Sequence, residues 1–131
     1  MSYGNPNRRT YVFPNVDFGA GDSAHSLRGP NGKEGKLIDI HLSATETFNS
    51  VTTDANVQVG ISGGDLDAYA LFVPGDLAAT DAISAQNGAD SDWLLDANIP
   101  ADTAVEVTCI APTGGTPAGI ATVTVVIDWA D

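Results

Sequence analysis

Residues 105–129 read VEVTCIAPTGGTPAGIATVTVVIDW, and this stretch decides the fold class. Its two ends, residues 105–111 and 120–129, are rich in Val, Ile and Thr, which favour strands. In the second run, Val123, Val125, Ile127 and Trp129 alternate with other residues, as expected of a strand with one buried face. The intervening residues 112–119 are Gly- and Pro-rich and form a loop. Two such runs joined by a loop predict an antiparallel pair.

Working outward, three further runs predict strands. Residues 37–43 alternate and place Ile38, Ile40 and Leu42 on one face, and residues 56–61 do the same with Val57, Val59 and Ile61. Residues 68–73 are apolar on both faces and predict a strand that lies centrally or under another element. The turn-forming sequence of residues 29–35 separates the first run from the preceding segment. The whole pattern predicts an all-β fold, an antiparallel β-sandwich of jelly-roll-like type.

Residues 76–100 leave two alternatives open. Asp76 is a suitable cap for a short helix over residues 77–86, which are rich in Ala. The segment is equally consistent with an irregular crossing between the two sheets, with Trp93 holding the loop around residues 90–95. We favour the irregular crossing.

The first 24 residues differ from the rest and predict an N-terminal arm (1–24) ahead of the sandwich domain (25–131). The arm contains several Gly and Pro residues around a β-prone piece, residues 10–13. Arg8 and Arg9 precede Tyr11 and Phe13, and these residue types are enriched at interface hot spots. Two interpretations remain: residues 11–13 are the first strand of the domain's own sheet, or the arm reaches a neighbour, as in strand addition.

Charge is distributed unevenly along the chain. The net charge is −12, yet all five basic residues, Arg8, Arg9, Arg28, Lys33 and Lys36, lie within the first 36 positions. Because a long cation-free surface repels nucleic acid and anionic membranes, we expect neither as a partner. The N-terminus lacks a secretion-signal pattern and no run is long enough for a membrane helix, so we expect synthesis in a cytoplasm.

No set of residues suits a catalytic site. The histidines are His25 and His41, and His41 has Asp39 nearby but no serine in a nucleophile elbow. Cys109 is the single cysteine and lies in an apolar run, which predicts a buried, unreactive thiol. We therefore predict that the protein is not an enzyme and carries no cofactor.

Calcium binding is an alternative that the sequence leaves open. Asp65 and Asp67 follow two glycines, and Asp90 and Asp92 lie in a polar loop beside Trp93. Alternate carboxylates in loops offer the oxygen ligands that Ca²⁺ prefers, although neither pair has the residues of a 12-position calcium loop, so no metal site is assigned. If either pair binds calcium, a lectin-like carbohydrate-binding module with Trp93 or Tyr69 stacking on a sugar becomes the alternative function.

Several segments together resemble the small head decoration, or cement, proteins of tailed bacteriophages. They are the run 35–40, the strand 57–61 with Gly64 and Asp65 after it, the segment 99–103, and the closing 111–119 with its Val-rich strand and Trp129. The likeness covers about residues 25–131. It implies a jelly-roll-like sandwich on the outer surface of the virion, which binds the major capsid protein and clamps neighbouring subunits.

The resemblance also implies a capsid-binding extension, which corresponds by position to Arg8, Arg9, Tyr11 and Phe13; Arg28, beside the first turn, completes the candidate set. A homo-oligomer is expected, with a trimer favoured over a dimer. A head-fibre or tail component on the same fold is a further alternative.

Overall fold

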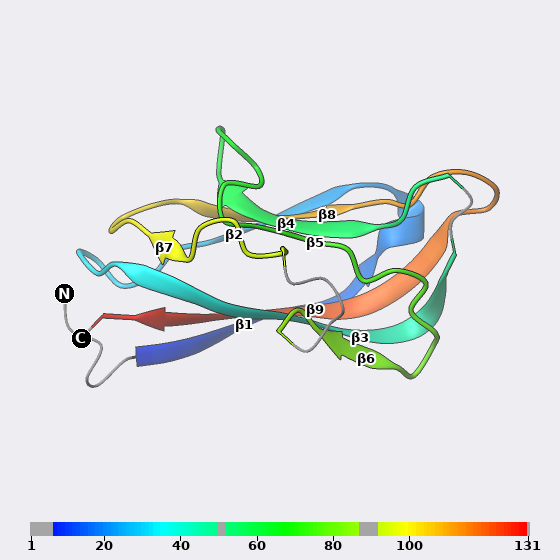
Figure 1. Cartoon of the computed structure of the whole chain (residues 1–131), viewed down its shortest axis with the longest axis horizontal. Coiled ribbons are helices and arrows are strands. Elements are labelled where there is room, and N and C mark those ends of the chain that lie inside the picture. Colours follow the sequence, from blue (N-terminus) through cyan, green and yellow to red (C-terminus); the bar gives the residue numbers. More distant parts are fainter. Residues whose placement is uncertain (1–6, 50–51, 87–91, 131) are drawn as a thin grey trace.

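The computed structural model describes residues 7–49, 52–86 and 92–130 and shows two antiparallel β-sheets packed face to face (Figure 1). One sheet has the order β1-β9-β3-β6, with β7 also pairing with β3; the other has the order β2-β8-β4-β5. The elements are β1 (Asn7–Asp17), a 3₁₀ turn η1 (Phe18–Ala20), β2 (Ser23–Leu27), β3 (Gly35–Asn49), β4 (Asn56–Ile61), β5 (Ala70–Phe72), β6 (Ala82–Ser84), β7 (Asn98–Ile99), β8 (Val105–Ile110) and β9 (Ala118–Trp129). The predicted all-β antiparallel sandwich is thus confirmed.

The core lies between the sheets and follows the period-two pattern of the sequence. Val123, Val125 and Ile127 of β9 are fully buried, and they face the core together with Val105 and Val107 of β8. Because successive side chains of a strand point to opposite faces, the alternate residues of β9 lie on the outer surface. Trp93 is also buried in this core, as predicted for the loop that it holds.

The predicted pairing of the two C-terminal runs is wrong. β8 pairs with β2 and β4, whereas β9 pairs with β1 and β3, so the two runs belong to different sheets. Both strands bury an apolar face, and a connection that crosses between the sheets lets these faces oppose each other across the core. The length of the loop and its two prolines suit such a crossing better than a tight hairpin.

Smaller departures have local causes. Ile38 is only half-buried because the register of β3 against β9 shifts between Leu37 and Asp39, so that Leu37 takes the inward position. Ile61 ends β4 and is exposed. No helix forms over residues 77–86, where turns and the short β6 make an irregular crossing, as favoured above.

Most of the predicted arm is part of the two sheets. β1 pairs with β9 along its length, with a register shift around Pro14 and Asn15, and β2 begins at Ser23 in the other sheet. Residues 7–17 therefore match the first of the two interpretations, a strand of the domain's own sheet, and they form its edge. Residues 1–6 lie outside the described part of the chain.

Candidate interaction surface

The topology gathers all five basic residues at one end of the sandwich. β1 begins there, β2 ends there and β3 begins there (Figure 1). These strand ends place Arg8, Arg9, Arg28, Lys33 and Lys36 at the same end of the sandwich, although they are spread over 29 positions of sequence. We call this end, defined by these five residues, the basic end. Glu34, Asp102 and Asp128 also lie in its strands and loops, so the surface is mixed in charge rather than purely cationic.

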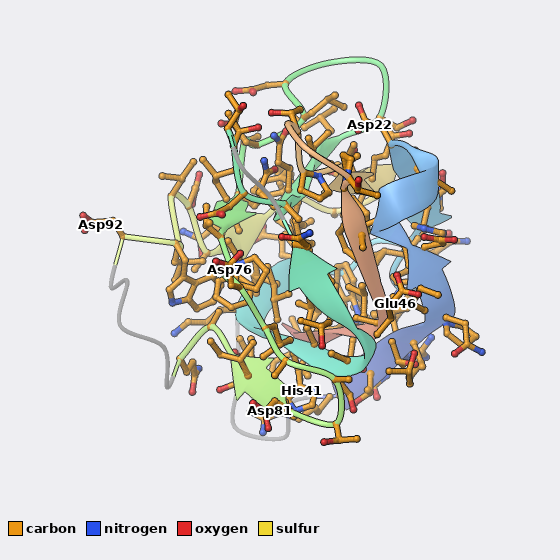
Figure 2. The ribbon with its side chains drawn as sticks, turned by 90° about the vertical axis from the view of Figure 1, so that its right-hand side faces the viewer. Asp22, His41, Glu46, Asp76, Asp81 and Asp92 are labelled. Carbon is orange, nitrogen blue, oxygen red and sulfur yellow. The ribbon has the colours of Figure 1, made fainter. Side chains whose placement is uncertain are left out.

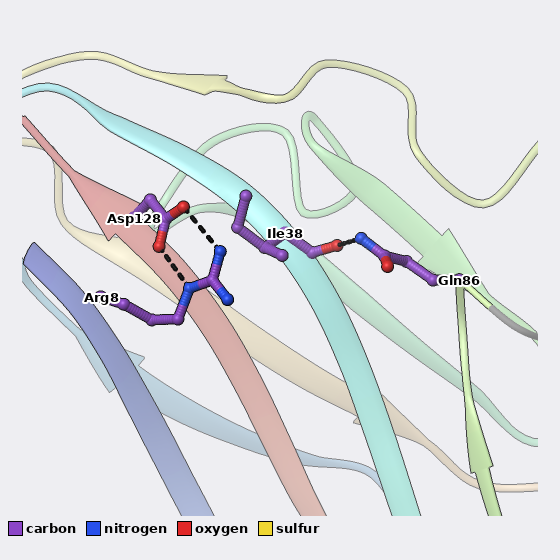
Figure 3. Close-up of polar contacts among 4 residues, drawn as sticks. All are labelled: Arg8, Ile38, Gln86 and Asp128. Atoms are coloured by element: carbon purple, nitrogen blue, oxygen red, sulfur yellow. Dashed lines mark hydrogen bonds and ion pairs between the residues drawn. The ribbon is translucent and has the colours of Figure 1, made fainter. Parts of the chain in front are cut away.

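Arg8 is fixed on the outer face of the sheet by Asp128 of β9. Its Nε donates to Asp128 Oδ1 at 2.6 Å and its second guanidinium nitrogen donates to Oδ2 at 2.9 Å (Figure 3). These hydrogen bonds from Arg8 lower the pKa of Asp128, against the opposing effect of burial. The forked geometry orients the guanidinium and ties the edge strand to the sheet.

The other cations are presented to solvent with fewer constraints. Arg9 and Lys36 are exposed, and Arg28 is exposed while donating to the carbonyl oxygen of Asp102 at 2.9 Å. Asp102 also accepts from the backbone N–H of Gly32, which fixes the β2–β3 loop against the loop before β8. Arg28 and Lys33 therefore lie on a loop that these hydrogen bonds hold in place.

Tyr11 and Phe13 point towards the core and are only partly buried. The Tyr11 hydroxyl accepts a hydrogen bond from Trp129 Nε1 at 2.9 Å, and Phe13 stacks on His25 with ring centroids 4.8 Å apart. Phe13 thereby joins β1 to β2 across the open side of the sandwich. Both side chains pack within this chain, which covers most of their surface and holds the edge strand in place.

The indole of Trp129 is the centre of the basic end. A Cβ at Gly29 or at Gly35 would lie 2.5 Å from atoms of its ring, so both glycines are in contact with the indole. Side chains at either position would displace the ring, which explains the two glycines on either side of the turn. The ring thus supports the β2–β3 loop and the first strand together.

The opposite end carries acidic residues and none of the five cations. Figure 2 shows Asp22, Glu46, Asp76 and Asp81 spread around this end rather than gathered together. Accordingly, no group of three potential metal-ligating side chains occurs within the described ranges. The five cations therefore lie at one end of the strands, whereas acidic residues lie at both ends.

The candidate calcium ligands make at most a pair. The carboxyl groups of Asp65 and Asp67 interact, and the hydrogen bond with Asp65 raises the pKa of Asp67. In the other candidate pair, Asp90 lies outside the described residues. Among the described residues, no third His, Cys, Asp or Glu side chain joins Asp65 and Asp67 to form a metal-binding group.

The residues considered for catalysis are far from forming a site. Cys109 is fully buried, and burial raises the pKa of its thiol to about 12. His41 lies on the outer face of the sheet beside a hollow of 310 Å³, whose lining within the described residues is completed by Ala82, Ile83 and Ser84. Asp39 accepts from the backbone N–H groups of Ile40 and Gln86, so its described contacts are structural.

Gln86 also makes structural hydrogen bonds to β3, and the sequence did not predict this role. Its side-chain amide donates to the carbonyl oxygen of Ile38, at the irregular point of β3 (Figure 3). Asp128 was also missed as a partner of Arg8, because 120 positions separate the two residues. The outward position of Asp128 in an alternating strand was the one available signal.

Among the described residues, no helix has the length and apolar character needed to cross a bilayer.

Comparison with known proteins gives little. No family model matches the chain, and no curated protein matches it. Among solved structures, the chain is similar to one from the capsid asymmetric unit of cyanophage Pam1, with a TM-score of 0.40 and 14% identity over 98% of this chain and 88% of that one. A likeness at this level does not establish a shared fold and carries no functional argument.

Proposed function

We propose that this protein is a structural component of a phage virion, a decoration protein that binds the outer surface of the capsid and clamps neighbouring capsid subunits. The observation that carries the proposal is the gathering of all five basic residues at one end of an otherwise acidic sandwich. The resemblance of residues 25–131 to phage decoration proteins supports the same reading. Its partner is the major capsid protein, and it acts as a homo-oligomer.

The basic end is well built for docking onto a surface with exposed carboxylates. Arg9, Arg28 and Lys36 are exposed there, while Arg8 and the β2–β3 loop are held by Asp128 and by Trp129. A surface that is already ordered loses less conformational entropy when it binds. Charge complementarity would orient the approach and make the binding sensitive to salt.

Tyr11 and Phe13 have an indirect part in this proposal. Both pack against the chain's own core, so they position Arg8 and Arg9 by holding β1. Deleting residues 2–14 would remove most of β1 and expose β9, and so would not separate docking from folding. Point substitutions at the exposed cations are the appropriate probe.

The test compares co-sedimentation of the full chain with expanded phage heads for two charge-matched variants. Arg9→Gln with Arg28→Gln removes two charges at the basic end, whereas Ala78→Glu with Thr116→Glu changes the net charge by the same amount at exposed positions near the other end. We expect the first variant to lose at least tenfold in affinity and the second to bind like the unmodified protein. Failure of the unmodified protein to bind any capsid, or equal loss in both variants, would refute the proposal.

A further inference from the structure

The outer face of the sheet formed by β1, β9 and β3 has an ordered distribution of charge. The register pairs Thr10 with Val126, Val12 with Thr124, and Thr124 with His41, so these residues form adjoining rows across the face. Val12 is 54% exposed, and Val126 and Thr124 are half-buried. The middle of the face is thus largely β-branched, with Asp39 and His41 as its titratable groups.

The two ends of the same face carry opposite charges. At one end the register aligns Arg8, Asp128 and Lys36 in one row. Eight residues earlier in β9, at the other end, it aligns Asp17, Ile120 and Glu46. Each row has one charged residue on β1 and one on β3, and the signs of these residues are reversed between the rows. Asp128 on β9 leaves the first row with a net charge of +1, against −2 for the second, so the two ends still differ in sign.

We propose that this face binds a second copy of the same chain, face to face, about a two-fold axis that lies in the interface, perpendicular to the strands, at the level of Thr124. Thr124 is midway between Asp128 and Ile120 along β9. Rotation about this axis places β1 over β1 and β3 over β3 in opposite directions. Lys36 then lies across from Glu46 of the second copy, and Arg8 across from Asp17 of the second copy.

Charge complementarity favours a second copy of the chain as the partner of this face and sets the orientation of that copy. The face is complementary to itself, which is the requirement for an isologous interface. A two-fold axis parallel to the strands would instead bring the row of Arg8 and Lys36 over its own copy and set like charges together. In a chain of net charge −12, copies repel at most orientations, so the arrangement that pairs Lys36 with Glu46 is favoured over others.

The size of the face sets the expected strength. Eight residues of β9 span about 26 Å, and three strands add a width of about 15 Å, which gives on the order of 400 Å² per copy. Stable complexes bury roughly 800 Å² per partner. The dimer is therefore weak, and it has to be sought at high protein concentration. This self-association does not depend on the proposed capsid binding.

The test is sedimentation equilibrium of the full chain from about 10 μM to 1 mM, at low and at high salt. We expect a reversible dimer that weakens with salt. Thr124→Arg puts two cations near the axis and should weaken the dimer at least tenfold. The matched control is Ser26→Arg, at an exposed position of β2 in the other sheet, which should dimerise like the unmodified protein.

A charge swap tests the orientation. Lys36→Glu alone should weaken the dimer, and Lys36→Glu combined with Glu46→Lys should restore it. Glu46 also accepts from the backbone N–H of Gly119, so the thermal stability of each variant is measured beside its association. A monomer at 1 mM, a trimer, equal behaviour of Thr124→Arg and Ser26→Arg, or no recovery by a folded double variant would overturn the proposal.

Discussion

Replacing Gly35 by alanine should destabilise the protein through the indole of Trp129. The new Cβ would lie 2.5 Å from Cζ3 and 2.6 Å from Cε3 of that ring, about 1 Å closer than ordinary contact. The ring cannot move away from position 35, because the Cβ position of Gly29 lies 2.5 Å from other atoms of the same ring. In addition, the ring Nε1 donates a hydrogen bond to the Tyr11 hydroxyl. Gly35 has no positive φ, so the expected cost is steric alone.

Overpacking of this kind costs typically 1–3 kcal/mol, and the confined ring puts Gly35→Ala near the upper value, about 3 kcal/mol. For a domain of this size that corresponds to a fall of roughly 10 °C in Tm. Thermal and urea unfolding followed by Trp fluorescence measure both quantities. Gly64→Ala is the control, since its Cβ would meet only atoms of Ile61, the nearest being the side-chain Cγ2 at 3.3 Å, and it should change the stability by less than about 0.5 kcal/mol.

The double variant Gly35→Ala with Trp129→Leu tests whether the indole causes the loss of stability. A smaller side chain at position 129 leaves space for the new methyl group, so the two substitutions should be strongly non-additive. Additive costs, or a Gly35→Ala cost as small as that of Gly64→Ala, would show that the indole is not confined as described.

Three further predictions concern the core, the thiol and the ion pair. Val125→Ala, at a fully buried position, should cost about 2 kcal/mol in unfolding free energy, whereas Val126→Ala on the outer face should cost less than half of that in the same urea titration. Cys109 should react with a thiol reagent at pH 8 only as fast as the protein unfolds, because it is buried and its pKa is raised to about 12; rapid labelling of the folded protein would contradict this. Asp128→Asn should flatten the acid side of the stability curve. Arg8 lowers the pKa of Asp128 in the folded state. The ion pair therefore stabilises the fold at pH values above the unfolded pKa of about 3.9, and this stabilisation is lost as the pH falls through the lower folded pKa. An unchanged curve of unfolding free energy between about pH 5 and 2 would show that the pair does not contribute.

The sequence predicted β3, β4, β5, β8 and β9 and most of the faces that they bury, but not β2, β6 or β7. Alternation identified the inward residues of β9, and Gly- and Pro-rich turns marked the boundaries, because both effects are local. The pairing of β8 with β9 was predicted wrongly, since which strands become neighbours depends on how two buried faces meet across the core. The same limitation hid the ion pair of Arg8 with Asp128, whose partners become neighbours through the register of β1 and β9.

The candidate site was predicted in part. Composition identified Arg8, Arg9 and Arg28 as a distinct group of cations, and the topology brings them to one end with Lys33 and Lys36. For Tyr11 and Phe13 the sequence left two interpretations open, a strand of the domain's own sheet or anchors on a neighbour. The structure places them in contact with Trp129 and His25, which depends on the direction of each side chain in an edge strand and on long-range contacts.

The two proposed surfaces share Arg8 and Lys36, and the residues that they do not share make them separable by mutation. Lys36 belongs to the basic end and also to the charged row on the outer face of β1, β9 and β3, whereas Arg28 lies on the β2–β3 loop away from that face. If capsid docking and self-association are distinct, Arg28→Gln should weaken only the former, Thr124→Arg only the latter, and Lys36→Glu both. A protein that docks by one end and pairs by one face would bring two docking ends to opposite sides of a dimer, because the proposed axis reverses the strand direction. Such a dimer could join two separate acidic sites, which is the geometry that a clamp between neighbouring subunits requires.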